Sequence, residues 1–229
     1  MKTSIQVVLA LAFTTVAALG QVGVVTNSGV SPTTQGGLLT SPYELVSAGP
    51  NNRVWRCETY ETLPNGEVHT NTRSYQELRS GLNVQNGNGN WVAARPSIEI
   101  YSGGAIARHA QHQVIFANNL NTAGAIDVQA PDGVRLRSTV MGLMYSDAAS
   151  GQAVQIAALQ DSEGELVADH DNEVLYPSAL VDTNTGVMAD VLYENRLDGM
   201  DQSIVLKTQL PDPKVVYGMN PATTYLSVL

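Results

Sequence analysis

The stretch that decides the fold class reads RVWRCETYET over residues 53–62, LPNGE over 63–67 and VHTNTRSY over 68–75. Asn65-Gly66 supplies the positive backbone torsions that a tight hairpin turn requires. The flanking runs are rich in Val, Thr, Tyr and Trp, which pack well on a pleated surface. This pattern predicts an antiparallel hairpin in which Trp55, Cys57 and Thr59 share one face, because side chains alternate along a strand.

The same punctuation recurs along the chain. Two further hairpins are predicted, Ile126–Gln129 with Val134–Ser138 across Pro131-Asp132-Gly133, and Val187–Glu194 with Met200–Thr208 across Asp198-Gly199. No window carries apolar residues at helical spacing for three turns, and Tyr75–Leu82 is the best short helical candidate. Short strands separated by turn signals at a spacing of roughly 8–12 residues are typical of sandwiches. We therefore expect an all-β fold of antiparallel hairpins, in a β-sandwich or stacked sheets, with few or no helices.

The composition excludes several classes of protein. The 229 residues are 43% hydrophobic, which is too apolar for a fully disordered chain. A balance of 12 basic to 21 acidic residues gives a net charge of −9, which argues against binding to nucleic acid or to an anionic membrane. The single cysteine, Cys57, rules out an internal disulfide framework and is expected to pack as a small hydrophobic residue.

The N-terminus has the three parts of a secretory signal. Met1-Lys2 is followed by an uncharged, mostly apolar run over Ile5–Leu19, and small residues at Ala18 and Gly20 form the exit. We expect a signal peptide over residues 1–20 and a secreted or cell-surface chain. No later segment is long and apolar enough to span a membrane.

The rest of the chain is expected to have two parts. Residues 21–40 have the Gly, Ser, Thr and Asn content of a flexible segment. Residues 41–229 form the all-β region, as one domain or two small ones. The ending Thr223–Leu229 is apolar and strand-like, which favours the front of a longer chain over a last strand paired inside the sheet.

Catalytic, cofactor and metal motifs are absent from the sequence pattern, and no residue is assigned to these roles. His109 and His112 would point to opposite faces of a strand, so they are not expected to share a metal ion. The pattern Asp182-Thr-Asn184-Thr-Gly186 favours a turn over a calcium-binding loop. There is no Gly-x-Ser-x-Gly elbow. Paired carboxylates for sugar hydrolysis stay a second alternative, and the glutamates on predicted strands are Glu58, Glu61, Glu99 and Glu194.

Aromatic residues suggest a different use for a secreted β module. Trp91 follows an Asn/Gly turn, and nine tyrosines are scattered through the chain. Flat aromatic rings on an open face stack on the apolar surfaces of sugars. We therefore assign Trp91 as the candidate glycan contact of a carbohydrate-binding platform.

Six segments, taken in order, resemble the N-terminal β region of large secreted bacterial proteins. They are Ser41-Pro42-Tyr43, Asn52-Arg53-Val54-Trp55, His112–Phe116, Pro131–Ser138, Val174–Pro177 and Asn220–Thr224. Some of those proteins carry YD-repeat modules of the RHS type downstream. The resemblance implies export and further domains on the same polypeptide, and it implies no catalytic residues.

These observations favour a non-catalytic structural or interaction module of an exported surface or secreted protein. The alternatives are a carbohydrate-binding module and a hydrolase with carboxylates that converge in the fold. The expected partners are downstream domains of the same polypeptide, proteins at the cell surface or a glycan. Only two lysines, Lys207 and Lys214, lie after the predicted signal peptide. Because lysine is a usual guard against edge-to-edge pairing, self-association through strand edges is expected as well.

Overall fold

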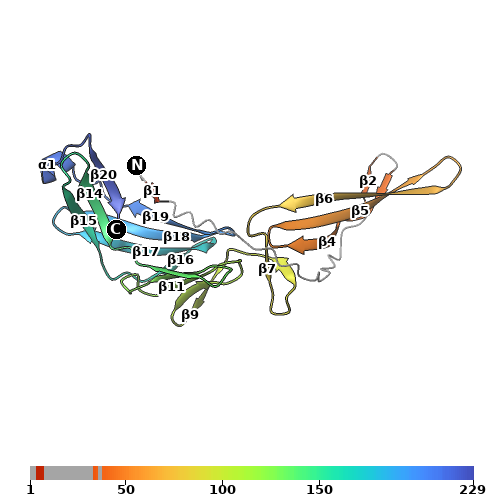
Figure 1. The fold of residues 1–229 in the computed structure, drawn as a ribbon, viewed down its shortest axis with the longest axis horizontal. Helices are drawn as coiled ribbons and strands as arrows, with labels where there is room; N and C mark the ends of the chain where they lie inside the picture. The colour runs from red at the N-terminus through yellow and green to blue at the C-terminus, as the bar shows by residue number, and fades with distance from the viewer. Residues whose placement is uncertain (1–3, 8–32, 36–37) are drawn as a thin grey trace. The chain divides into compact units, whose positions relative to one another are not determined.

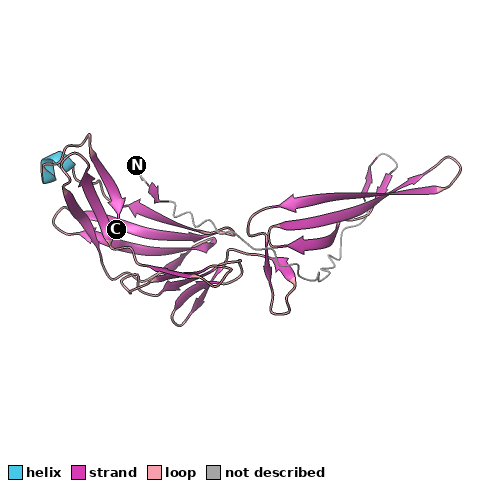
Figure 2. Cartoon of the chain, in the orientation of Figure 1, coloured by secondary structure: helices cyan, strands magenta, loops and turns pink. Residues whose placement is uncertain are grey.

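The regular secondary structure of the described part of the chain is almost entirely antiparallel strand (Figures 1 and 2). The structure, a computed structural model, describes residues 4–7, 33–35 and 38–229. The chain divides into two compact units. Unit 1 is formed by Pro96–Leu229 with the strand Ser4–Val7, and unit 2 by the described residues from Thr33 to Arg95. The predicted all-β class is confirmed.

Unit 1 contains a large sheet and a smaller one. The strands of the large sheet, in spatial order, are β1 (Ser4–Val7), β19 (Met200–Leu206), β18 (Val187–Asn195), β17 (His170–Asp182), β15 (Ala153–Leu159), β14 (Gly142–Asp147) and β20 (Thr224–Val228), and β16 (Glu165–Val167) also pairs with β17. The smaller sheet is an antiparallel meander of β13 (Arg135–Ser138), β12 (Ile126–Gln129), β11 (Gln113–Ala117), β10 (Gly104–Ala107) and β9 (Ile98–Tyr101).

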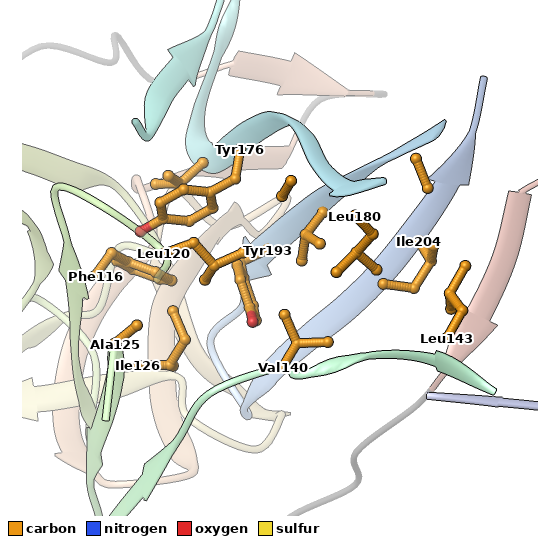
Figure 3. Packing of buried hydrophobic residues seen from close by; sticks show 14 of the residues in the cluster. Phe116, Leu120, Ala125, Ile126, Val140, Leu143, Tyr176, Leu180, Tyr193 and Ile204 are labelled. Carbon is orange, nitrogen blue, oxygen red and sulfur yellow. The ribbon is translucent and has the colours of Figure 1, made fainter. Parts of the chain in front are cut away.

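The two sheets of unit 1 share one apolar core (Figure 3). Phe116 and Ile126 come from the smaller sheet, and Tyr176, Tyr193 and Ile204 from the large one. The Tyr176 hydroxyl donates a hydrogen bond of 2.6 Å to the Ala117 carbonyl, so its polar tip is satisfied across the two layers. This packing makes unit 1 a sandwich.

Unit 2 is one small sheet with an added hairpin. Its strands are β2 (Thr33–Gln35), β3 (Leu38–Thr40), β4 (Glu44–Gly49), β5 (Asn52–Thr62) and β6 (Val68–Leu78), followed by the two-stranded β7 (Asn83–Gln85) and β8 (Trp91–Ala93). β5 is central: β3 and β4 pair with one of its sides and β6 with the other.

The three predicted hairpins are confirmed. β5 pairs with β6, β12 with β13 and β18 with β19, all antiparallel. The alternate residues Val187, Ala189, Val191 and Tyr193 of β18 are buried in the core. By contrast, Val134, just before β13, and Leu136 within it are exposed, because β13 is the edge strand of its sheet.

The helical candidate Tyr75–Leu82 is wrong. β6 continues through Leu78, and a turn with Gly81 in the left-handed region follows it. The long pairing with β5 outweighs any local helical tendency, since these residues are too polar to offer an apolar helix face. The only helix among the described residues is α1 (Pro213–Tyr217), with Asp212 as its N-cap. No helix in the described ranges is long and apolar enough to cross a membrane.

Two predicted N-terminal segments fall mostly outside the described residues. Of the predicted signal peptide 1–20 only Ser4–Val7 is described, and it pairs antiparallel with β19 at the edge of the large sheet. Of the predicted flexible segment 21–40 the described parts form β2 and β3. The ending Thr224–Val228 is β20, which pairs with β14.

The Asp190 carboxylate binds the backbone at an irregularity in the pairing of β17 with β18. The register of β17 against β18 shifts between Tyr176 and Leu180, and Ser178 there has a φ of 48°. The Asp190 carboxylate, 3% exposed, accepts hydrogen bonds of 2.8 Å from the Ser178 amide and 2.9 Å from the Lys207 ammonium. The bulge therefore has a buried acceptor for its free amide.

We expect Asp190→Ala to lower the free energy of unfolding by about 2 kcal/mol, since it leaves a buried donor unsatisfied. Lys207→Ala should cost less, because that ammonium is about half exposed and its ion pair is screened. Urea unfolding of both variants checks the order. Equal losses, or a loss under about 0.5 kcal/mol for Asp190→Ala, would contradict it.

Asp147 ties the β14–β15 turn to the start of β20. Its carboxylate accepts hydrogen bonds from the Thr223 hydroxyl, from the Ser150 hydroxyl at 2.8 Å and from the Ala149 amide at 3.0 Å. These bonds, that of Thr223 first, lower the pKa of Asp147 from 3.8 to about 2. The folded pKa lies below the unfolded one, so the contribution to stability is present above pH 3.8 and is lost as the pH falls toward 2.

We expect Asp147→Asn to flatten the pH dependence of unfolding between pH 4 and pH 2, the window set by that shift from 3.8 to about 2. Denaturant midpoints of the native chain and the variant, measured across this window, test the point. The same acid slope for both proteins would show that the Asp147 bonds do not stabilise the fold.

Candidate functional site

Three aromatic side chains meet on one face of the unit 2 sheet. The Tyr43 and Tyr75 ring centroids lie 5.0 Å apart, nearly perpendicular at 72°. The Trp55 and Tyr75 rings are almost parallel at 17°, with centroids 6.4 Å apart. Tyr43 is 44% exposed, Tyr75 is 48% exposed and Trp55 is half-buried. We call Tyr43, Trp55 and Tyr75 the aromatic face.

The hairpin register places two of these rings side by side. Trp55 on β5 lies directly opposite Tyr75 on β6, and opposite Leu45 on β4 at its other side. Directly opposed residues of an antiparallel pair point to the same face. Cys57 and Thr59 continue this face and are buried. The predicted sharing of one face by Trp55, Cys57 and Thr59 therefore agrees with the pairing.

Tyr43 reaches the same face by a different route. It lies between β3 and β4, where the Ser41 amide donates a 2.8 Å hydrogen bond to the Glu58 carbonyl and the Ser41 hydroxyl accepts one from the Glu58 amide. The neighbouring Cys57 thiol raises the pKa of Tyr43. Cys57 thus packs beside the aromatic face as a small buried side chain.

A chain of polar contacts holds the tryptophan ring in place. The Trp55 indole Nε1 donates to Glu77 Oε2 at 3.1 Å, and Arg53 Nη1 lies 3.5 Å from the same oxygen. The Arg53 Nε in turn donates to Asn83 Oδ1 at 2.8 Å. Asn83, 1% exposed, donates from its Nδ2 to the carbonyls of Gly49 and Asn52. The ring is therefore oriented by contacts that run back to the β4–β5 turn.

This arrangement suits a ligand with both apolar and hydroxyl surfaces. Exposed aromatic rings supply apolar area at a low cost in side-chain entropy, and indole and phenol groups carry a polar edge as well. On β6, Arg73 and Glu77 flank Tyr75 on the same face, two residues to either side. Charged donors and acceptors thus lie next to the rings.

The structure places Trp91, the residue assigned from the sequence, on the separate β7–β8 pair and not among the stacked rings of this cluster. Trp91 lies on β8 opposite Gln85 and is half-buried. None of the ring-to-ring contacts among the described residues involves it. Its role as a glycan contact stays a prediction. The sequence signal that locates the aromatic face is the turn at Asn65, because it sets the register that brings Trp55 opposite Tyr75.

The glutamates weighed for hydrolysis are engaged in separate places. Glu99 binds Arg108 and His109, and the His109 contact is the main reason that the pKa of Glu99 is lowered. Asp127 lies in the same cross-strand row as Glu99, on the far side of β10 and β11. The two residues are three strand spacings apart, or about 14 Å. Paired carboxylates in glycoside hydrolysis are roughly 5–10 Å apart, so these two are too distant.

Asp127 is itself neutralised by arginines. It accepts hydrogen bonds from Arg135 Nε at 3.1 Å and Arg137 Nε at 2.9 Å. Burial raises its pKa, but the two guanidinium groups outweigh burial and leave the pKa of Asp127 below its ordinary value. The cluster stabilises the β12–β13 hairpin.

Glu194 lies in a row of three carboxylates on neighbouring strands, between Glu173 and Asp201. Glu173 is 3.3 Å from His170, and Asp201 accepts a 2.8 Å hydrogen bond from Arg196. These partners lie within a few residues of the carboxylates they bind, so Glu173 and Asp201 are each engaged in a local side-chain contact. Of the remaining two, Glu58 accepts a 2.7 Å hydrogen bond from the Tyr60 hydroxyl, and Glu61 lies opposite His69.

The two histidines of the Arg108–His112 segment have separate partners. His109 contacts Glu99, whereas the buried His112 lies 2.9 Å from Asn195 Oδ1. Burial lowers the pKa of His112. Asp182 closes the β17–β18 turn by accepting from the Asn184 amide and the Thr185 hydroxyl. Within the described residues no group of three or more His, Cys, Asp or Glu side chains is placed to hold a metal ion.

Comparison with known protein families, with curated proteins and with solved structures finds no match to this chain. The resemblance to the N-terminal region of YD-repeat proteins therefore stays a prediction.

Proposed function

We propose that this chain is a non-catalytic interaction module whose unit 2 binds carbohydrate through the aromatic face. One observation carries the proposal: Tyr43, Trp55 and Tyr75 gather on one open sheet face while remaining substantially exposed. Exposing two tyrosines and part of a tryptophan forgoes burial that would stabilise the fold. A ligand that covers the rings restores that burial.

The chemistry of the surroundings favours a sugar over a purely apolar ligand. Glu77 and Arg73 stand beside the rings, and both can hydrogen-bond hydroxyl groups. The contact from Glu77 to the indole fixes the ring before any ligand arrives. Pre-organised aromatic surface is the usual way to reduce the entropic cost of binding.

We expect Trp55→Ala and Tyr75→Ala each to raise the dissociation constant for a bound polysaccharide at least tenfold, as truncation of a buried aromatic anchor does. Affinity electrophoresis in gels containing hydroxyethylcellulose, arabinoxylan or alginate measures the loss. Trp91→Ala tests the residue assigned from the sequence alone and serves as the matched control: if the aromatic face is the site, this variant should migrate as the native chain does.

Tyr75→Ala keeps the test valid if Trp55→Ala unfolds unit 2, because the Tyr75 side chain is about half exposed and its removal costs little stability. Circular dichroism reports the fold of each variant. The proposal would be overturned if none of the polysaccharides slowed the migration of the native chain. A loss with Trp91→Ala that equals the loss with Trp55→Ala would move the site to β8.

We further propose that the module is exported after removal of residues 1–20, as the N-terminal pattern supports. Mass spectrometry of the chain recovered from a secreting host should give Gln21 as the first residue. Cleavage would remove β1, which contributes four residue pairs at the edge of β19. Unit 1 of a chain that begins at Gln21 should therefore unfold cooperatively and bury the same core, and an unprocessed chain would contradict export.

A further inference from the structure

We propose that two copies of this chain associate through β6, with the two strands antiparallel about a two-fold axis at Tyr75. β6 spans eleven residues and pairs with β5 without a register shift. In the described part of the chain no strand pairs with its other edge. An edge that is long, regular and unpaired is a template for a further strand.

The hydrogen bonds at the two ends of the hairpin show which residues of β6 face outward. The Leu63 amide donates to the Glu67 carbonyl, and the Arg79 amide donates to the Asn51 carbonyl. Hydrogen-bonded pairs alternate with non-hydrogen-bonded pairs along an antiparallel ladder. The odd-numbered residues from Glu67 to Arg79 therefore direct their amides and carbonyls toward β5, and the even-numbered ones direct theirs outward.

The outward-facing residues carry none of the usual guards of an edge. They are Val68, Thr70, Thr72, Ser74, Gln76 and Leu78, which include no charged residue and no proline. Proline, lysine, inward-pointing charge and bulges are the devices that protect natural edges from pairing. Since β6 has none of these at the outward-facing positions, its backbone is free to pair.

Charge selects the register. If the two β6 strands overlapped fully, the two-fold axis would lie at Arg73 and the two Arg73 side chains would lie opposite each other, which is unfavourable. If the axis lies at Tyr75 instead, Arg73 of each copy lies opposite Glu77 of the other, and Tyr75 lies opposite Tyr75. A centre at Thr70 also opposes opposite charges, but it uses five residues of the strand and runs into the turn at Gly66. The centre at Tyr75 overlaps the longer stretch from Thr72 to Leu78.

The outward residues fit this register. With the axis at Tyr75, Ser74 lies opposite Gln76 and Thr72 lies opposite Leu78, all of which have outward amides. They form about eight backbone hydrogen bonds between the copies. Tyr75 then falls at a non-hydrogen-bonded position, where opposed side chains approach most closely. Opposed residues share a face, so the aromatic faces of the two copies would lie next to each other in one continuous sheet.

Analytical ultracentrifugation of the full chain without glycan tests the association. The native chain should dimerise reversibly with rising concentration. Ser74→Pro removes an outward amide inside the overlap and should raise the dissociation constant at least tenfold. Thr70→Pro removes an outward amide outside the overlap and is the matched control, which should dimerise as the native chain does.

Charge reversal tests the register itself. Arg73→Glu alone and Glu77→Arg alone should each be monomeric, because like charges then face each other. An equimolar mixture of the two variants should form a heterodimer, since every opposed pair is again of opposite charge. This readout survives a modest loss of stability in either variant.

Three results would overturn the inference: a native chain that stays monomeric at all accessible concentrations, equal effects of Ser74→Pro and Thr70→Pro, or a mixture that stays monomeric. The association does not depend on sugar binding. Ser74→Pro leaves the aromatic face in place, so a monomeric variant that still binds polysaccharide separates the two proposals.

Discussion

The tight turn at Asn65-Gly66 sets the register of β5 against β6, and the candidate surface of unit 2 follows from that register. Gly66 has a φ of 82°, the Gly66 amide bonds the Leu63 carbonyl, and Asn65 accepts from the Glu67 amide. A slip of one residue would move Trp55 and Cys57 to the opposite face, because side chains alternate. The stacking of Trp55 on Tyr75 and the outward set of amides are both consequences of one turn.

Unit 1 depends on a different constraint, the closure of two sheets over a core that includes tyrosines. Tyr176 can lie fully buried because its hydroxyl reaches the Ala117 carbonyl on the opposite sheet. Gly164 lies against the same ring: a Cβ there would approach a Tyr176 ring carbon to 2.9 Å. The close approach of backbone to ring explains a glycine at that point.

Much of the fold could be predicted from local chemistry, since Asn-Gly and Asp-Gly turns and alternating stripes are local signals. The pairing of Trp55 with Tyr75 follows from counting residues outward from the turn. Tyr43 could not be found this way, because it lies on irregular backbone between β3 and β4 and reaches its partners through tertiary contacts. The bulge at Ser178 could not be predicted from the sequence either, because the acceptor of its amide, Asp190, is twelve residues away. Trp91 follows a turn signal as strong as the others, yet exposure depends on what packs against a strand.

The low charge content, 14% of residues, acquires a structural meaning at β6. Its outward-facing residues are uncharged, whereas its two charges, Arg73 and Glu77, lie on the face with Tyr75. Charge at the outward positions would repel a second strand and keep the edge single. Charge on the aromatic face instead opposes Arg73 to Glu77 only when the strands are offset about Tyr75. The same few ionised groups therefore leave the edge free to pair and select one register over the others, which a uniformly polar strand would not do.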